Sequence, residues 1–257
     1  MFIDYDNLNN CKEEYRKSWM SKQPFKFLVI DNFLLPDKAE ELYQAYPKIE
    51  EAVWENTTYI NQKNKFVKTK FDDAPVLERI FEELNSESFR ELLGEITNVD
   101  GILGDEELFG AGLHQSIKGA FLDVHVDFNI HPKTGYHRRM NLLIYMNKDW
   151  QESYNGYLEL WDMSKKKRIE YISPKFNRAV IFETNEVSFH GHPKPLNTPI
   201  GISRKSISVY YYTPSRPAAE VVNEHNTIYA NTQGMKGVIK NFKSGLKASI
   251  ERIFNKS

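Results

Sequence analysis

The sequence has little cysteine, little net charge and no long apolar run, and each of these absences excludes a class of function. Cys11 is the only cysteine among 257 residues, which excludes an intrachain disulfide and a Cys-rich zinc site. The 34 Lys and Arg nearly balance the 35 Asp and Glu, so net charge gives no reason to expect nucleic acid or an acidic membrane as a partner. No run approaches the ~18 apolar residues of a membrane span, and the first twenty residues lack the apolar stretch of a secretory signal. We therefore expect a soluble, cytoplasmic protein.

Hydrophobic patterning changes along the chain from helical spacing to short alternating runs. A β-like apolar run at 25–33 leads into a helical stretch at 38–45, and helical spacing recurs at 75–84 and 89–96. Alternating, strand-like runs occur at 118–128, 138–147, 157–161, 168–172, 178–183 and 204–213. Because no helical pattern separates these runs, an antiparallel double sheet is favoured over a parallel one. We predict an α+β fold with a mainly β core, a double-stranded β-helix of the jelly-roll or cupin-like kind with supporting N-terminal helices.

The domain organisation expected from these patterns is a single domain over residues 1–215, with helical support in 1–107 and the jelly-roll core in 108–215. Residues 216–257 are expected to form a C-terminal helical tail, because apolar residues from Gly234 onward share one helical face. Such a face packs on its own domain or on a second copy, so a homodimer through this amphipathic helix is one prediction. The polar segment 48–74 is either a loop over a binding site or an irregular strand pair, and the strand pair is favoured.

Three residues have the types and spacing of a metal site. His125 and Asp127 are two apart in a strand-like run, so both side chains point to the same face. A second imidazole from His190, on another predicted strand, would complete the two-His, one-carboxylate set that leaves positions open on iron(II). The His-x-Asp triplet alone is a weak signal, and His192 is an alternative ligand two residues beyond His190.

An arginine and a serine add a second kind of site to this set. Arg204 begins the run RKSISVYYYT, and alternation places Ser206 on the same face. A forked guanidinium with a neighbouring hydroxyl is suited to bind one end of a dicarboxylate. Arg139 and Arg178 are rival carboxylate partners, but neither has a hydroxyl two residues further on. The triad together with Arg-x-Ser is far more specific than either motif alone.

At this point the chain resembles the 2-oxoglutarate and iron(II) oxygenases, and specifically their prolyl-4-hydroxylase-like branch. The resemblance covers roughly residues 24–213. It rests on FLVIDNFLLPDKAEEL, GAFLDVHVDFN, RRMNLLIYMNKDW, YLELW, FHGHP and SRKSISVYYYT, in the family's order. One departure is Asn155-Gly156-Tyr157, where the family usually has Gly-Gly.

The resemblance implies that the three metal-ligand candidates hold Fe(II), and that Arg204 and Ser206 bind the 5-carboxylate of the cosubstrate 2-oxoglutarate. It adds Tyr145, Asn141 and Gln115 as residues near the cosubstrate. The implied activity is a dioxygenase that uses O2 to hydroxylate an unactivated C–H bond, with ascorbate as an optional reductant. The substrate is either a prolyl side chain in a protein or peptide, or a free amino acid, sugar or secondary metabolite. The rival classes are a cupin-like binding protein without catalysis and a zinc hydrolase that makes no use of Arg204.

Overall fold

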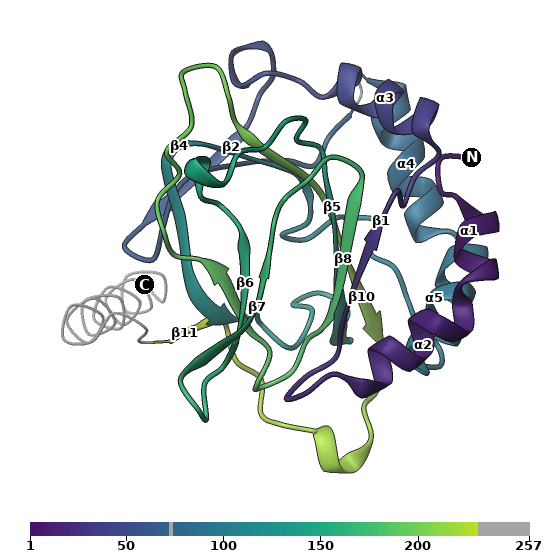
Figure 1. The fold of residues 1–257 in the computed structure, drawn as a ribbon. Coiled ribbons are helices and arrows are strands. Elements are labelled where there is room, and N and C mark those ends of the chain that lie inside the picture. Colours follow the sequence, from purple (N-terminus) through teal and green to yellow (C-terminus); the bar gives the residue numbers. More distant parts are fainter. Residues whose placement is uncertain (72–73, 231–257) are drawn as a thin grey trace.

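A computed structural model describes residues 1–71 and 74–230, and Figure 1 shows their arrangement. The α-helices in this part of the chain are α1 (Tyr5–Asn10), α2 (Lys12–Ser21), α3 (Pro36–Ala45), α4 (Pro75–Asn85) and α5 (Glu87–Thr97). The strands are β1 (Phe27–Asp31), β2 (Glu55–Tyr59), β3 (Gln62–Lys68), β4 (Gly112–Val126), β5 (His137–Tyr145), β6 (Leu158–Asp162), β7 (Lys167–Ile172), β8 (Arg178–Glu183), β9 (Phe189–His192), β10 (Arg204–Thr213) and β11 (Ile228–Tyr229).

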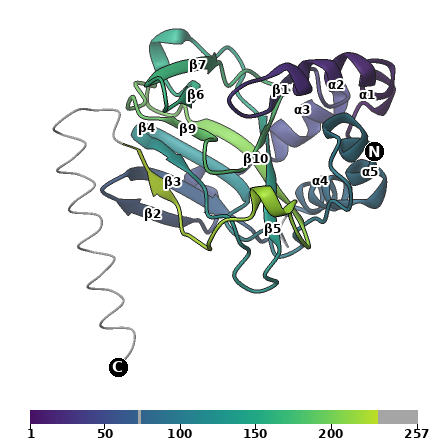
Figure 2. The same cartoon turned by 90° about the horizontal axis from the view of Figure 1, so that it is seen from below.

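The strands form a curled antiparallel sheet in the order β1-β8-β5-β10-β4-β9-β6-β7, with β3 and β11 also paired to β4 and β2 paired to β3. Strand β4 pairs with β10 over its first residues and with β9 near its end, so this one strand links the two layers. Figures 1 and 2 show the helices gathered at one side of the sheet and the β2–β3 hairpin at the other. This mainly β arrangement confirms the predicted fold.

Helices α4 and α5 cover the sheet because each presents one apolar face. Pro75 begins α4, and the Ser86 hydroxyl accepts a hydrogen bond from the Phe89 amide to cap α5. The buried apolar residues of these two helices are Leu77, Ile80, Phe81, Leu84, Phe89, Leu92, Leu93 and Ile96. Each such side chain contributes roughly 1.5 to 3 kcal/mol when fully buried, which fixes the helical layer against the outer face of the sheet.

Within the polar segment 48–74, strands β2 and β3 form a hairpin, which confirms the favoured strand-pair prediction. Strand β3 pairs with β4 from Lys68 to Gln62, so the hairpin extends the sheet on the side of β4 away from β10. Helices α1 and α2 lie within the region 1–107 where helical support is expected, although residues 1–20 show no clear periodicity of apolar positions that would give their bounds.

Residues 216–230 differ from the expected helical tail. They contain no α-helix, only a short 3-10 turn at Ala218–Glu220 and strand β11, in which Ile228 and Tyr229 pair with Val126 and His125 of β4. Pro214 and Pro217 disfavour a helix directly after β10. The helix predicted from Gly234, and with it the dimer contact, lies outside the described residues. None of the helices in residues 1–71 and 74–230 is long and apolar enough to cross a bilayer.

Candidate active site

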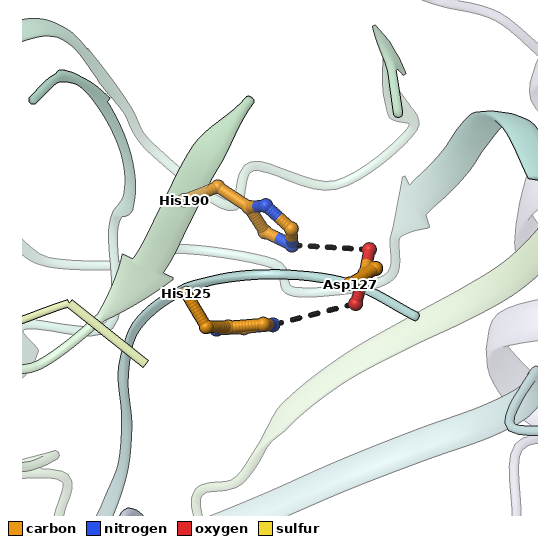
Figure 3. A group of neighbouring side chains, drawn as sticks. All are labelled: His125, Asp127 and His190. Carbon is orange, nitrogen blue, oxygen red and sulfur yellow. Dashed lines mark ion pairs between the residues drawn. The ribbon is translucent and has the colours of Figure 1, made fainter. Parts of the chain in front are cut away.

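Two histidines on neighbouring strands face one carboxylate. His125 of β4 and His190 of β9 are direct cross-strand partners, so their imidazoles lie side by side with ring centroids 4.4 Å apart. Asp127 follows the last residue of β4, and its two carboxylate oxygens lie 3.4 Å from His125 Nε2 and 3.6 Å from His190 Nε2. Figure 3 shows the three side chains converging on one point.

Backbone carbonyls fix the orientation of both imidazoles. Nδ1 of His125 lies 2.7 Å from the carbonyl oxygen of Asp123, and Nδ1 of His190 lies 2.9 Å from that of Ser188. A carbonyl oxygen can only accept, so each Nδ1 carries the proton and donates it. Each Nε2 is left with a free lone pair directed at Asp127, which is the tautomer a metal requires.

The spacing of these donor atoms fits a metal ion. Within the described residues, His125, Asp127 and His190 are the one group of three or more such side chains whose ligand atoms all lie within 4.8 Å of one another. Metal–ligand bonds of about 2.1 Å at right angles place neighbouring donors about 3 Å apart. Small movements of the side chains would therefore bring all three donors onto one ion. Three protein ligands on one side leave further coordination positions open.

Arg138 and Asn141 hold the carboxylate of Asp127, and no motif in the sequence indicates this role of Arg138. The Asn141 amide donates to Asp127 Oδ2 at 2.7 Å, and Arg138 Nη2 lies 3.1 Å from the same oxygen. Arg138 is almost completely buried, with its guanidinium 3.5 Å from the ring centroid of Tyr210. Burial raises the pKa of Asp127, but the neighbouring positive charge of Arg138 opposes it, and the pKa is well below its ordinary value. The carboxylate is ionised and oriented before any metal binds.

Burial acts on His190 in the direction that metal binding needs. Removal from water, reinforced by the neighbouring His125, lowers the pKa of His190 to about 4 although Asp127 opposes the change. The imidazole is thus neutral at physiological pH and can act as a ligand.

Arg204 lies in the same cavity with part of its guanidinium unused. Its Nε donates to the carbonyl oxygen of Gly156 at 2.7 Å, and its Nη2 donates to the Tyr145 hydroxyl at 3.1 Å. Gly156 has φ +74°, and a Cβ there would lie 2.4 Å from Leu196 and 3.1 Å from Arg204, so only glycine fits this close approach. The Asn155-Gly156 departure from the family pattern thus keeps the glycine that contacts the arginine.

The other residues expected near a cosubstrate divide into two groups. Ser206 and Asn141 line the cavity, and Tyr145 is fully buried beside Arg204. Gln115 does not line the cavity, and its amide donates to the Ser203 hydroxyl at 2.7 Å. Its neighbours in β4, His114 and Ser116, line the cavity instead.

The two other arginines that could have bound a cosubstrate carboxylate form ion pairs with acidic residues away from the cavity. Arg178 makes a two-pronged ion pair with Asp31 at 2.6 and 2.8 Å, and Arg139 pairs with Glu220 at 3.3 Å. The structure places His190, not His192, beside Asp127, whereas His192 lines the cavity on the same strand.

The cavity that contains these groups is narrow, about 80 Å³, and is lined by residues of β3, β4, β5, β6, β8, β9 and β10. A larger groove of about 920 Å³ lies along α2, α5 and the loop to Leu103. That groove contains surface acidic and basic side chains without a converging ligand set. The narrow cavity is therefore the candidate active site, since convergent polar groups and shifted pKa values are found there.

The fold and this ligand set define the class of double-stranded β-helix proteins with a two-His, one-carboxylate metal site, the arrangement of non-haem iron oxygenases. Residues 111–212 match the model of the 2OG-Fe(II) oxygenase superfamily. The matched segment contains the three candidate ligands and Arg204.

Individual proteins are similar to parts of this chain or to its fold. An 82-residue segment is 33% identical to the mouse (Mus musculus) prolyl 3-hydroxylase OGFOD1, which is 30% of this chain but only 15% of that protein. Among solved structures, a prolyl hydroxylase from Trichoplax adhaerens, in complex with a hypoxia inducible factor peptide, superposes with a TM-score of 0.56 at 17% identity, covering 81% of this chain and 91% of that one. A prolyl-4-hydroxylase from Pseudomonas putida gives 0.55 at 15% identity, covering 78% and 100%. HygX from Streptomyces hygroscopicus, with nickel, 2-oxoglutarate and hygromycin B bound, gives 0.51 at 10% identity, covering 84% and 97%.

Proposed function

We propose that this protein is a prolyl hydroxylase-like oxygenase that uses Fe(II), 2-oxoglutarate and O2 to hydroxylate a proline in a protein or peptide. The observation that carries the proposal is the placement of two anchored histidines, one oriented carboxylate and one partly unused guanidinium in a single cavity. The prolyl hydroxylases among the relatives support proline as the target. We also propose that residues 1–215 act as one domain, with the jelly-roll core in 108–215.

In this proposal the metal is held by His125, Asp127 and His190, and it supplies the redox chemistry that activates O2. Arg204 binds the 5-carboxylate of 2-oxoglutarate with the N–H groups that Gly156 and Tyr145 leave free. This contact fixes the direction in which the keto acid enters the cavity, so that its other end faces the triad.

The protein groups around the site have three tasks. Ser206 lines the cavity two residues from Arg204 and offers a hydroxyl donor to the same carboxylate. Asn141 keeps the Asp127 carboxylate in place. Leu143, Leu158 and Phe182 form the apolar wall that limits the access of water. The net reaction converts 2-oxoglutarate and O2 to succinate and CO2 while one C–H bond of the substrate becomes C–OH.

The reaction class is tested by adding Fe(II) and 2-oxoglutarate without oxygen and then admitting O2. We expect a weak visible charge-transfer band on mixing, followed by succinate formation. A metal-loaded protein that shows neither band nor succinate would be a binding protein or a hydrolase, and the proposal would be wrong.

The substrate class is tested separately by mass spectrometry. The protein is incubated with Fe(II), 2-oxoglutarate, ascorbate and either proline-containing peptides or small metabolites from a lysate. A +16 Da change on a prolyl residue supports the proposal. The same change on a free amino acid, sugar or secondary metabolite, with peptides unchanged, would contradict the proline assignment and keep the oxygenase class.

We further infer that the protein works in a reducing compartment such as the cytoplasm. The single cysteine, Cys11, supports this inference, because the chain is not built around disulfides.

A further inference from the structure

Lys65 brings a second cation into the candidate active site from outside the jelly roll. It lies on β3, where it pairs with Ser116 of β4, and Ser116 in turn pairs with Arg204 of β10. Direct cross-strand partners point to the same face, and two strand spacings of about 4.8 Å separate Lys65 from Arg204 at the backbone. Consistent with this register, Lys65, Ser116 and Arg204 all line the cavity that contains the metal-ligand triad.

The ammonium group of Lys65 has no hydrogen bond or ion pair with any residue in 1–71 or 74–230. The other cation beside the triad, Arg138, is different, because it is bound to Asp127 and Asn141. Lys65 is half-buried, and burial lowers its pKa to about 8, while Asp127 raises it and Arg138 and Arg204 lower it. The side chain is therefore a cation in the metal-free protein at neutral pH, with no anion assigned to it.

A count of charges shows what this cation does when the proposed ligands bind. The cavity of the free protein is lined by one carboxylate, Asp127, and two cations, Lys65 and Arg204, while a third cation, Arg138, is paired with Asp127. A divalent metal increases the positive charge, so Lys65 opposes its binding. The dianion 2-oxoglutarate reduces the positive charge, so Lys65 favours its binding.

We propose that Lys65 couples the two binding steps, weakening the binding of the metal alone and strengthening the binding of 2-oxoglutarate to the metal-loaded protein. The proposal rests on the proposed function, because it assumes that both ligands occupy this cavity. It assigns a role to the β2–β3 hairpin, which places a positioning residue next to the reacting groups although the hairpin lies outside the jelly-roll strands.

The test compares Lys65→Met, Lys65→Arg and Lys63→Met with the unmodified full chain. Lys63→Met is the matched control, because Lys63 is on the same hairpin but exposed. Metal affinity is measured with Mn(II) alone from the loss of its free-ion electron paramagnetic resonance signal. Affinity for 2-oxoglutarate is measured on the Fe(II)-loaded protein from the charge-transfer band without oxygen.

Lys65→Met is expected to bind Mn(II) about tenfold more tightly and 2-oxoglutarate about tenfold more weakly, the size expected for one unit charge acting through a partly hydrated site. Lys65→Arg and Lys63→Met should both behave as the parent. Opposite changes cannot come from partial unfolding, which weakens both steps. If Lys65→Met changes neither affinity, or changes both in the same direction, the coupling role is wrong while the proposed function stands. If the parent chain binds neither ligand, the proposed function itself fails.

Discussion

Replacement of Arg204 by Met tests how the cavity recognises its carboxylate. The buried guanidinium would be lost while an unbranched side chain of similar length fills the space. We expect affinity for 2-oxoglutarate to collapse and affinity for the metal to remain within a few-fold of the parent, since Arg204 contacts none of the three candidate ligands.

The magnitude follows from the donors that Arg204 has free. A guanidinium has five N–H donors, and two of them are used by Gly156 and Tyr145, which leaves three for a ligand. Two charge-assisted hydrogen bonds to a carboxylate contribute about 1.5 to 3 kcal/mol each, or roughly 3 to 5 kcal/mol together after desolvation. At 1.4 kcal/mol per factor of ten, the dissociation constant should increase by roughly 100- to 4,000-fold.

The assay is an anaerobic titration of the Fe(II)-loaded protein with 2-oxoglutarate, with Mn(II) binding measured in parallel. Arg178→Met is the matched control, because it removes an arginine of the same sheet that is paired with Asp31 at the surface, and it should leave both affinities unchanged. An Arg204→Met protein that binds 2-oxoglutarate as tightly as the parent would refute the assignment. Loss of metal binding as well would show that Arg204 supports the fold of the site and does not act through the cosubstrate.

Three further predictions concern the metal-ligand triad. His190→Ala should abolish stoichiometric metal binding, whereas His192→Ala should retain it, and metal content after dialysis distinguishes the two. Asn141→Ala removes the amide that holds Asp127 and should weaken metal binding about 10- to 100-fold, as measured by competition with a chelator; unchanged affinity would contradict that role. Burial and a neighbouring imidazole lower the pKa of His190 from 6.5 to about 4, so the unfolded chain takes up a proton before the folded protein does. Stability of the metal-free protein should therefore be complete above pH 6.5 and fall as the pH drops toward 4, and urea midpoints of His190→Gln should show a smaller decrease than those of the parent.

The strands, the supporting helices and the candidate ligands could be predicted from the sequence because each depends on local spacing. The His-x-Asp pair follows from the two-residue period of a strand, and Arg204 and Ser206 share the period of β10, whose bounds match the prediction. The cap of α5 is also local, because Ser86 directly precedes the helix. All of these features depend only on residues that are close together in the sequence.

Features that depend on strand irregularities or on distant contacts could not be predicted in the same way. Strict alternation of side chains along β4 would place Gln115 on the same face as His125. The pairing of β4 with β9, however, shifts register between Leu122 and His125. As a result, His114 and Ser116 face the cavity and Gln115 does not. The ion pair between Arg138 and Asp127 forms because the chain turns after β4 and β5 then lies beside Asp127. No local sequence pattern predicts this contact.

The most direct test of the central claim is the fate of molecular oxygen. The metal-loaded protein is given 2-oxoglutarate and ¹⁸O2, and the succinate formed is analysed by mass spectrometry. The account predicts succinate with one ¹⁸O atom in the parent and none formed in Asp127→Ala, which lacks the carboxylate shared by both histidines. Unlabelled succinate, or equal amounts of product from the two proteins, would contradict an oxygenase reaction at this site.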